Sequence, residues 1–163
     1  MPFRRTNSRK GNKMNRKLIW LGMFAMLSLF VSSQLFSQED DIKKRKSLMK
    51  SNNKASKALK KAVKGQDFPT IEENAKKIAA NANNIVALFP EGSTAKNSRA
   101  KAEIWQEKDD FKAKANDLKG AARKLANAAK AMDSEQVKVQ YKAVGKACGS
   151  CHKRYRARKK KRR

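Results

Sequence analysis

Apolar residues recur every three or four positions along most of the chain, a pattern typical of helices that bury one face. The first such segment runs from residue 42 to residue 63 without Gly or Pro, and Gly65 is expected to end it. The residues expected on one face of this helix, which we call its stripe, are spaced by three, four or seven positions. They are Ile42, Met49, Ser56, Leu59 and Val63. A long first helix is therefore predicted.

A second stripe follows a helix-start signal. Thr70 and Glu73 have the spacing of a capping box, in which each side chain satisfies a backbone N–H of the first turn. The predicted stripe contains Ile71, Ala75, Ile78, Ala82, Ile85 and Phe89. Pro90 and Gly92 should end this helix, and residues 91–100 are polar and predicted to form a loop.

Two further stripes complete the pattern. Ile104 and Trp105 begin an ordered stretch, and the third stripe is Phe111, Ala115, Leu118, Ala122, Leu125, Ala129 and Met132. Asp133, three residues before Gln136, resembles another cap, and the fourth stripe is Val137, Tyr141, Val144, Cys148, Cys151 and Tyr155. No segment alternates with period two, so the prediction is an all-α antiparallel four-helix bundle.

Alanine is frequent on these stripes. Helices can approach closely at alanine, but a core of small side chains lacks bulk. A large apolar cofactor would supply that bulk.

The first 33 residues resemble a targeting segment. The 14 residues from Leu18 to Val31 are almost all apolar, basic residues precede them, and Ser32 and Ser33 follow. This is the order of a secretory signal peptide, and 14 residues are short for a membrane span of about 20. An uncleaved anchor running to Phe36 is the alternative. The predicted organisation is a signal peptide or anchor (1–33), a helical domain (34–156) and a basic tail (157–163), with the domain exported to the periplasm.

Charge is concentrated at the two ends. The 163 residues include 41 Lys or Arg and 14 Asp or Glu, a net charge of +27. Seven basic residues precede residue 34 and nine lie in residues 153–163, with no acid in either segment. The remaining domain is only moderately basic, which is compatible with folding.

The chemistry is concentrated in one pentapeptide. Cys148-Gly149-Ser150-Cys151-His152 has the C-x-x-C-H form of covalent c-type haem attachment, and it contains every Cys and the only His of the chain. On a helix, residues three and four apart share a face, so the two thiols and the imidazole would point to one side. A zinc site lacks ligands, a thioredoxin-like motif lacks its βαβ context, and a simple disulfide leaves the adjacent His unexplained. Haem c is the predicted cofactor.

The position of this motif near the C-terminus of four helices resembles the class II c-type cytochromes, the cytochrome c prime and cytochrome c-556 family. The resemblance extends over residues 41–156. Its other matching segments are Arg45-Lys46-Ser47-Leu48-Met49, Lys64-Gly65-Gln66, Leu88-Phe89-Pro90-Glu91-Gly92-Ser93, Lys101-Ala102-Glu103-Ile104-Trp105, Asp110-Phe111 and the run from Val144 to Arg156. It implies a four-helix bundle with haem bound near one end. The basic tail departs from the family pattern.

The resemblance also implies roles for single residues. Cys148 and Cys151 would hold the haem, His152 would be the proximal iron ligand, and Met49 would face the distal side. Ligation by Met49 would suit electron transfer, whereas an open position would favour nitric oxide or carbon monoxide; plain core packing of Met49 is the alternative.

Two arginines match family positions near the haem. Arg45 matches one near a haem propionate, and Arg156 matches one on the proximal side. For each of the two, a solvated surface position is an equal alternative.

The charge and the motif together limit the function classes. One His and no paired catalytic carboxylates argue against a substrate-transforming enzyme. Export argues against nucleic acid as a partner for the tail, so the expected partners are an acidic redox protein or, through the tail, an anionic membrane surface. A solvated end of the fourth helix that mainly adds solubility is an equal alternative for the tail. The protein is expected to be a monomer or a homodimer.

Overall fold

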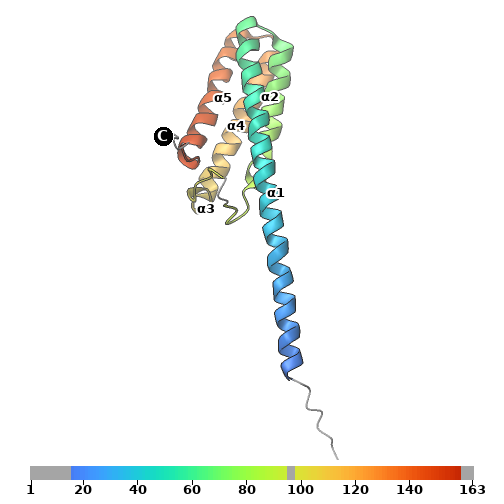
Figure 1. Cartoon of the computed structure of the whole chain (residues 1–163). Coiled ribbons are helices and arrows are strands. Elements are labelled where there is room, and N and C mark those ends of the chain that lie inside the picture. Colours follow the sequence, from blue (N-terminus) through green and yellow to red (C-terminus); the bar gives the residue numbers. More distant parts are fainter. Residues whose placement is uncertain (1–15, 95–97, 159–163) are drawn as a thin grey trace, which may run out of the picture. The chain divides into compact units, whose positions relative to one another are not determined.

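A computed structural model describes the backbone of residues 16–94 and 98–158, and the side chains of residues 39–94 and 98–158 (Figure 1). The chain divides after Phe36, and the unit that begins at Ser37 contains the bundle. Residues 1–15 of the predicted targeting segment and residues 159–163 of the predicted basic tail lie outside the described residues. Both segments stay predictions. In the described part, no helix is long and apolar enough to span a membrane.

The architecture is an all-α antiparallel four-helix bundle, which confirms the predicted fold class (Figure 1). The four long helices are α1 (Arg16–Gly65), α2 (Phe68–Asn83), α4 (Lys108–Lys130) and α5 (Ser134–Tyr155). Two short helices lie between α2 and α4, namely the 3-10 helix η1 (Val86–Leu88) and α3 (Glu103–Gln106). α4 packs against both α2 and α5.

The start of α2 differs from the prediction. Its N-cap is Asp67, whose carboxylate accepts the N–H of Thr70 at 3.1 Å. The helix begins at Phe68 because Pro69 fits the first turn, where an N–H would have no intrahelical partner. The Thr70–Glu73 capping box was therefore the wrong start signal. Gln66, with φ of 55°, makes the turn from α1.

The end of α2 also differs. The regular helix stops at Asn83, six residues before Phe89, and tighter three-residue hydrogen bonds continue through η1. Pro90 disfavours helical geometry at Phe89, which has φ of −121°. Ile85 and Phe89 therefore reach the interior from a turn rather than from a helix. By contrast, the predicted cap of α5 is confirmed, because Asp133 accepts the N–H of Gln136 at 2.9 Å.

The core is built largely from small residues. Alanine makes up nearly half of the buried apolar residues. The large apolar side chains that are fully buried are Leu59, Ile71, Ile78 and Leu125. On α1, Ala55 and Ala62 are buried together with Leu59, whereas the predicted stripe residues Ser56 and Val63 are only half-buried. Larger side chains and space for a ligand are found toward one end of the bundle.

Candidate functional site

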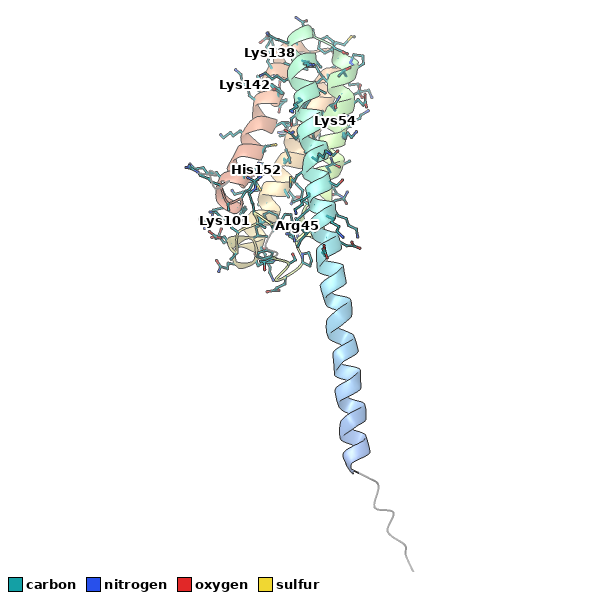
Figure 2. The ribbon with its side chains drawn as sticks, viewed as in Figure 1. Arg45, Lys54, Lys101, Lys138, Lys142 and His152 are labelled. Atoms are coloured by element: carbon teal, nitrogen blue, oxygen red, sulfur yellow. The ribbon has the colours of Figure 1, made fainter. Side chains whose placement is uncertain are left out.

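A cavity of about 700 Å³ opens between α1, α4 and α5, a size typical of cofactor sites. Figure 2 shows Arg45 of α1 and His152 of α5 toward the same end of the bundle, away from Lys138 and Lys142. The predicted site residues Arg45, Met49, Cys148, Cys151, His152 and Arg156 all line this cavity. The structure thus brings together every site residue that the sequence suggested.

The two cysteines lie on α5 and are half-buried in the cavity wall. Both are free thiols, so the simple-disulfide alternative is wrong for this structure. Burial raises the pKa of Cys148, and it raises the pKa of Cys151 to about 11, although nearby Lys114 acts in the opposite direction. Both groups are therefore protonated thiols at neutral pH. The described residues contain no cluster of His, Cys, Asp or Glu that could hold a metal ion by itself.

His152 follows Cys151 on the same helix. Desolvation lowers the pKa of its imidazole, and the positive charge of Arg99 lowers it further. The ring is consequently neutral at neutral pH, which is the form that binds a metal ion.

Arg45 is a buried cation at the edge of the cavity. It is 5% exposed, its Nη2 donates to the backbone oxygen of Ser93 at 2.6 Å, and its guanidinium lies 4.5 Å from the centre of the Phe89 ring. The solvated alternative for Arg45 is therefore wrong. Desolvation lowers the pKa of Arg45, partly offset by Asp41.

Arg45 and its partner Ser93 have polar atoms without hydrogen-bond partners. Nε and Nη1 of Arg45 and Oγ of Ser93 are buried without a hydrogen-bond partner in the protein. Unpaired buried donors are costly, so these atoms indicate a ligand with anionic or acceptor groups. A haem propionate is such a group.

Met49 lies one turn after Arg45 on α1. Its side chain is half-buried, packs against the core and lines the same cavity as His152. This position is compatible with both predicted roles, iron ligand and packing residue.

Arg156 lies just beyond α5 and is exposed although it lines the cavity. Its neighbour in space is Ala100, with which it forms an isolated antiparallel bridge. Phe111 of the third predicted stripe is buried and lines the cavity. Trp105 instead donates from Nε1 to the oxygen of Pro90 at 2.7 Å and is not part of the lining.

Sequence reasoning missed three contributors. Lys114 lines the cavity from α4, and the four-residue spacing to the buried Leu118 was an available signal. Phe89 was assigned to a helical stripe, yet it stacks on Arg45. Ser93 acts through its carbonyl oxygen, which no residue pattern identifies.

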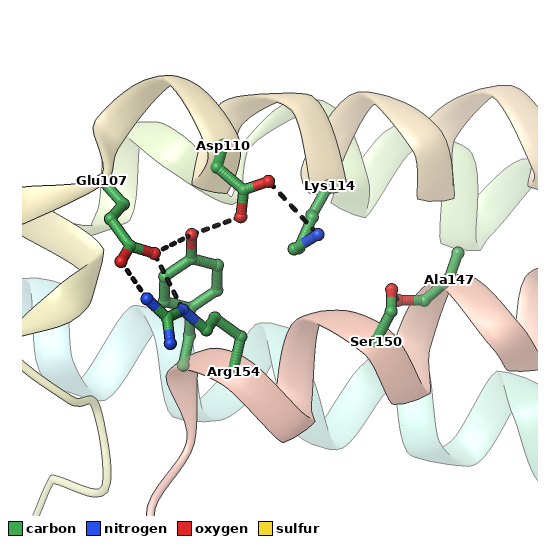
Figure 3. Close-up of polar contacts among 7 residues, drawn as sticks. Glu107, Asp110, Lys114, Ala147, Ser150 and Arg154 are labelled. Carbon is green, nitrogen blue, oxygen red and sulfur yellow. Dashed lines mark hydrogen bonds and ion pairs between the residues drawn. The ribbon is translucent and has the colours of Figure 1, made fainter.

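A polar cluster lies beside the cavity, where the start of α4 meets the end of α5 (Figure 3). The buried Tyr155 hydroxyl donates to Asp110 at 2.5 Å and lies 3.1 Å from Glu107, which is also paired with Arg154. Lys114 pairs with Asp110 at 3.3 Å. Burial and both carboxylates raise the pKa of Tyr155. The cluster therefore fixes the end of α5 that follows His152.

We expect acid to weaken this cluster. Bonding from Arg154 lowers the pKa of Glu107, and bonding from Tyr155 lowers the pKa of Asp110. A carboxylate with a depressed folded-state pKa stabilises the fold above its unfolded pKa, and this contribution is lost as the pH falls through the folded value. In urea unfolding, Tyr155→Phe should therefore destabilise the protein at pH 7, and the difference should shrink below about pH 4.

The half-buried Tyr141 offers a matched control, because none of the described hydrogen bonds involves its hydroxyl. Tyr141→Phe should show little difference at either pH. A Tyr155→Phe effect that is independent of pH would contradict the assignment.

These observations together fit the haem predicted from C-x-x-C-H. The cavity has two free thiols on one helix, a neutral imidazole beside them, and a thioether on the facing helix. A buried cation with unpaired donors lies at its edge.

Comparison with known proteins agrees with the predicted family. A family profile described as Cytochrome C' matches residues 40–156. The chain is 39% identical over 124 residues to cytochrome c' of Pararhodospirillum photometricum, a match covering 74% of this chain and 98% of that protein. It is 34% identical over 122 residues to cytochrome c-556 of Agrobacterium tumefaciens (strain II Chrys), covering 73% and 98%.

Solved structures also resemble this chain. Cytochrome c' from Thermochromatium tepidum superposes with a TM-score of 0.69 at 31% identity, covering 74% of this chain and 97% of that one. The nitric oxide complex of a mutant cytochrome c prime from Alcaligenes xylosoxidans superposes with a TM-score of 0.68 at 29% identity, covering 75% and 97%.

Proposed function

Because the chain belongs to the cytochrome c' family of proteins with covalently attached haem c, we propose that it is an exported one-electron carrier that works in the periplasm. The haem supplies an iron that alternates between the ferric and ferrous states. The apolar run 18–31 and the covalent haem motif support export, since c-type haem is attached outside the cytoplasmic membrane.

Each site residue has a proposed task in this function. Cys148 and Cys151 would hold the cofactor through thioether bonds, and the neutral His152 would bind its iron. Arg45, fixed by Ser93 and Phe89, donates its free N–H groups to a propionate. Lys114 adds a positive charge to the lining from α4. Arg156 shields the proximal side.

The observation that carries the electron-transfer role is the position of Met49. Its thioether and the His152 imidazole line one cavity from two different helices, α1 and α5. Ligation by Met49 as well as His152 would leave no open coordination position, would keep the iron low-spin and would raise its reduction potential. Such an iron would not need to change its ligands when it gains or loses an electron, which would suit a carrier.

A second candidate function is binding of nitric oxide or carbon monoxide at an open distal position. The nitric oxide complex of the Alcaligenes xylosoxidans relative is the observation that favours it. In that case Met49 would only pack against the core.

A visible absorption spectrum of the purified exported form separates the two functions. The carrier should be low-spin and six-coordinate when oxidised and when reduced, and it should not respond to carbon monoxide. A high-spin spectrum that shifts with carbon monoxide would support gas binding instead. Loss of haem from the denatured chain would overturn both functions.

Met49→Ala gives the corresponding prediction for a single residue. Removing the thioether should open a coordination position, convert most of the iron to high spin and permit carbon monoxide binding. The control is Met132→Ala, because Met132 is the most exposed large apolar side chain described and is not part of the cavity lining. An unchanged resting spectrum in Met49→Ala would contradict ligation.

A further inference from the structure

A second pocket, of about 400 Å³, adjoins His152 on the surface of the bundle. Its charged lining residues are Arg99, Lys153, Arg156 and Arg158, which we call the basic patch. All four are exposed. Among the described residues, no acidic side chain lines this pocket, and the remaining lining residues besides His152 are Gly149 and Ala157.

The basic patch is preorganised by backbone hydrogen bonds. The N–H of Ala157 donates to the oxygen of Arg99 at 2.8 Å, and the N–H of Lys101 donates to the oxygen of Tyr155 at 3.0 Å. The N–H of Arg156 donates to the oxygen of His152 at 3.1 Å. The first two bonds hold the segment before α3 against the end of α5 and the residue Ala157 beyond it. Charges far apart in sequence are therefore fixed beside His152 before any partner binds, which lowers the entropic cost of binding.

Neighbouring cations differ from the patch because they are already paired. Arg154 is bonded to Glu107, and Lys101 lies 3.6 Å from Glu103. None of the ion pairs described in the structure involves Arg99, Lys153, Arg156 or Arg158. Among the described residues at this end of α5, the basic side chains that form no ion pair therefore surround the pocket that His152 also lines.

We propose that the basic patch is the docking surface for an acidic electron-transfer protein. Guanidinium groups bind carboxylates through two parallel hydrogen bonds, so three arginines around a recess fit clustered Asp and Glu side chains. A membrane surface would require only positive charge and no proximity to His152, whereas a redox partner must approach the haem. The proposal rests on the proposed carrier function, and it identifies the surface of the protein through which the haem exchanges an electron with its partner.

The test compares two charge reversals of equal size in the haem-containing protein. Lys153→Glu with Arg158→Glu alters the basic patch at two residues that do not line the haem cavity, while Lys138→Glu with Lys142→Glu alters lysines on the same helix at least ten residues before His152. Figure 2 shows Lys138 and Lys142 away from His152. The probe is a reduced flavodoxin of strongly negative net charge, whose flavin gives one electron to the ferric haem. Stopped-flow absorption measures the rate at low and high salt.

At low salt, the patch variant should react about tenfold more slowly than the Lys138/Lys142 variant, and the difference should disappear at high salt. Both variants should retain the native spectrum and should react equally with an uncharged quinol reductant. Equal slowing of the two variants would overturn the proposal, because only net charge would then matter. Failure of the unaltered protein to accept an electron from either reductant would instead overturn the carrier function.

Discussion

Serine at both Cys148 and Cys151 is expected to abolish covalent haem attachment. Thioether bonds require sulfur, and these two side chains are the only thiols in the chain. The hydroxyl of serine is close in size to the thiol, so α5 should still form from Ser134 to Tyr155. Because both side chains line the cavity, haem could still enter it, but it would be held only by non-covalent contacts.

The measurement is the amount of haem that stays with the chain after denaturation and extraction into acidic organic solvent. The unaltered protein should retain all of its haem, and the double variant should retain none. Ser150→Ala is the matched control, because Ser150 lies between the two cysteines and its hydroxyl donates only to the oxygen of Ala147, at 3.1 Å (Figure 3). Haem that remains on the double variant would show that attachment occurs elsewhere.

The residue pattern predicted the helices well where their ends depend on local chemistry. Asp133 was identified as a cap because its side chain reaches a backbone N–H three residues on, and this is what the structure shows. The start of α2 was misassigned because two caps compete within four residues. Asp67 wins since Pro69 favours an earlier first turn, a preference that the Thr70–Glu73 spacing does not reveal.

The candidate site was predictable where it is encoded by spacing along one helix. Cys148, Cys151 and His152 share a face of α5, so their convergence followed from helical geometry. The environment of Arg45 did not, because it depends on a loop 48 residues away that supplies the Ser93 carbonyl. Arg45 is one of four consecutive basic residues (43–46), and only tertiary packing distinguishes this buried residue from its solvated neighbours.

The basic patch was hidden for the same reason. Lys153 was counted only as part of the basic C-terminal run, Arg156 was matched to a position near the haem, and Arg158 was assigned to the basic tail. Arg99 lay in a segment predicted to be a loop. Only the bridge between Ala100 and Arg156 brings these segments together. Charge counting along the sequence therefore located the excess charge but not the surface on which it acts.

Leu125→Ala should cause a large loss of stability, because few large side chains fill the alanine-rich core and each one supplies a large share of its packing. Leu125 is 0% exposed on α4, the helix that packs against both α2 and α5. Its buried neighbours on α4 include Ala122, Ala126 and Ala129, which are too small to move into the space left behind. The free energy of unfolding should fall by about 2–5 kcal/mol, toward the upper part of that range, because the cost of a cavity rises when its walls cannot collapse.

Urea unfolding at equal haem loading, followed by circular dichroism, measures this loss. Val139→Ala is the comparison, since Val139 is 53% exposed on α5 and its shortening should change the free energy of unfolding by no more than about 0.5 kcal/mol. Because the haem stays covalently bound in both variants, any difference reports packing in the alanine-rich part of the bundle rather than loss of the cofactor. A Leu125→Ala loss as small as that of Val139→Ala would mean that this part of the core relaxes freely, and close packing of small residues would then no longer account for its stability.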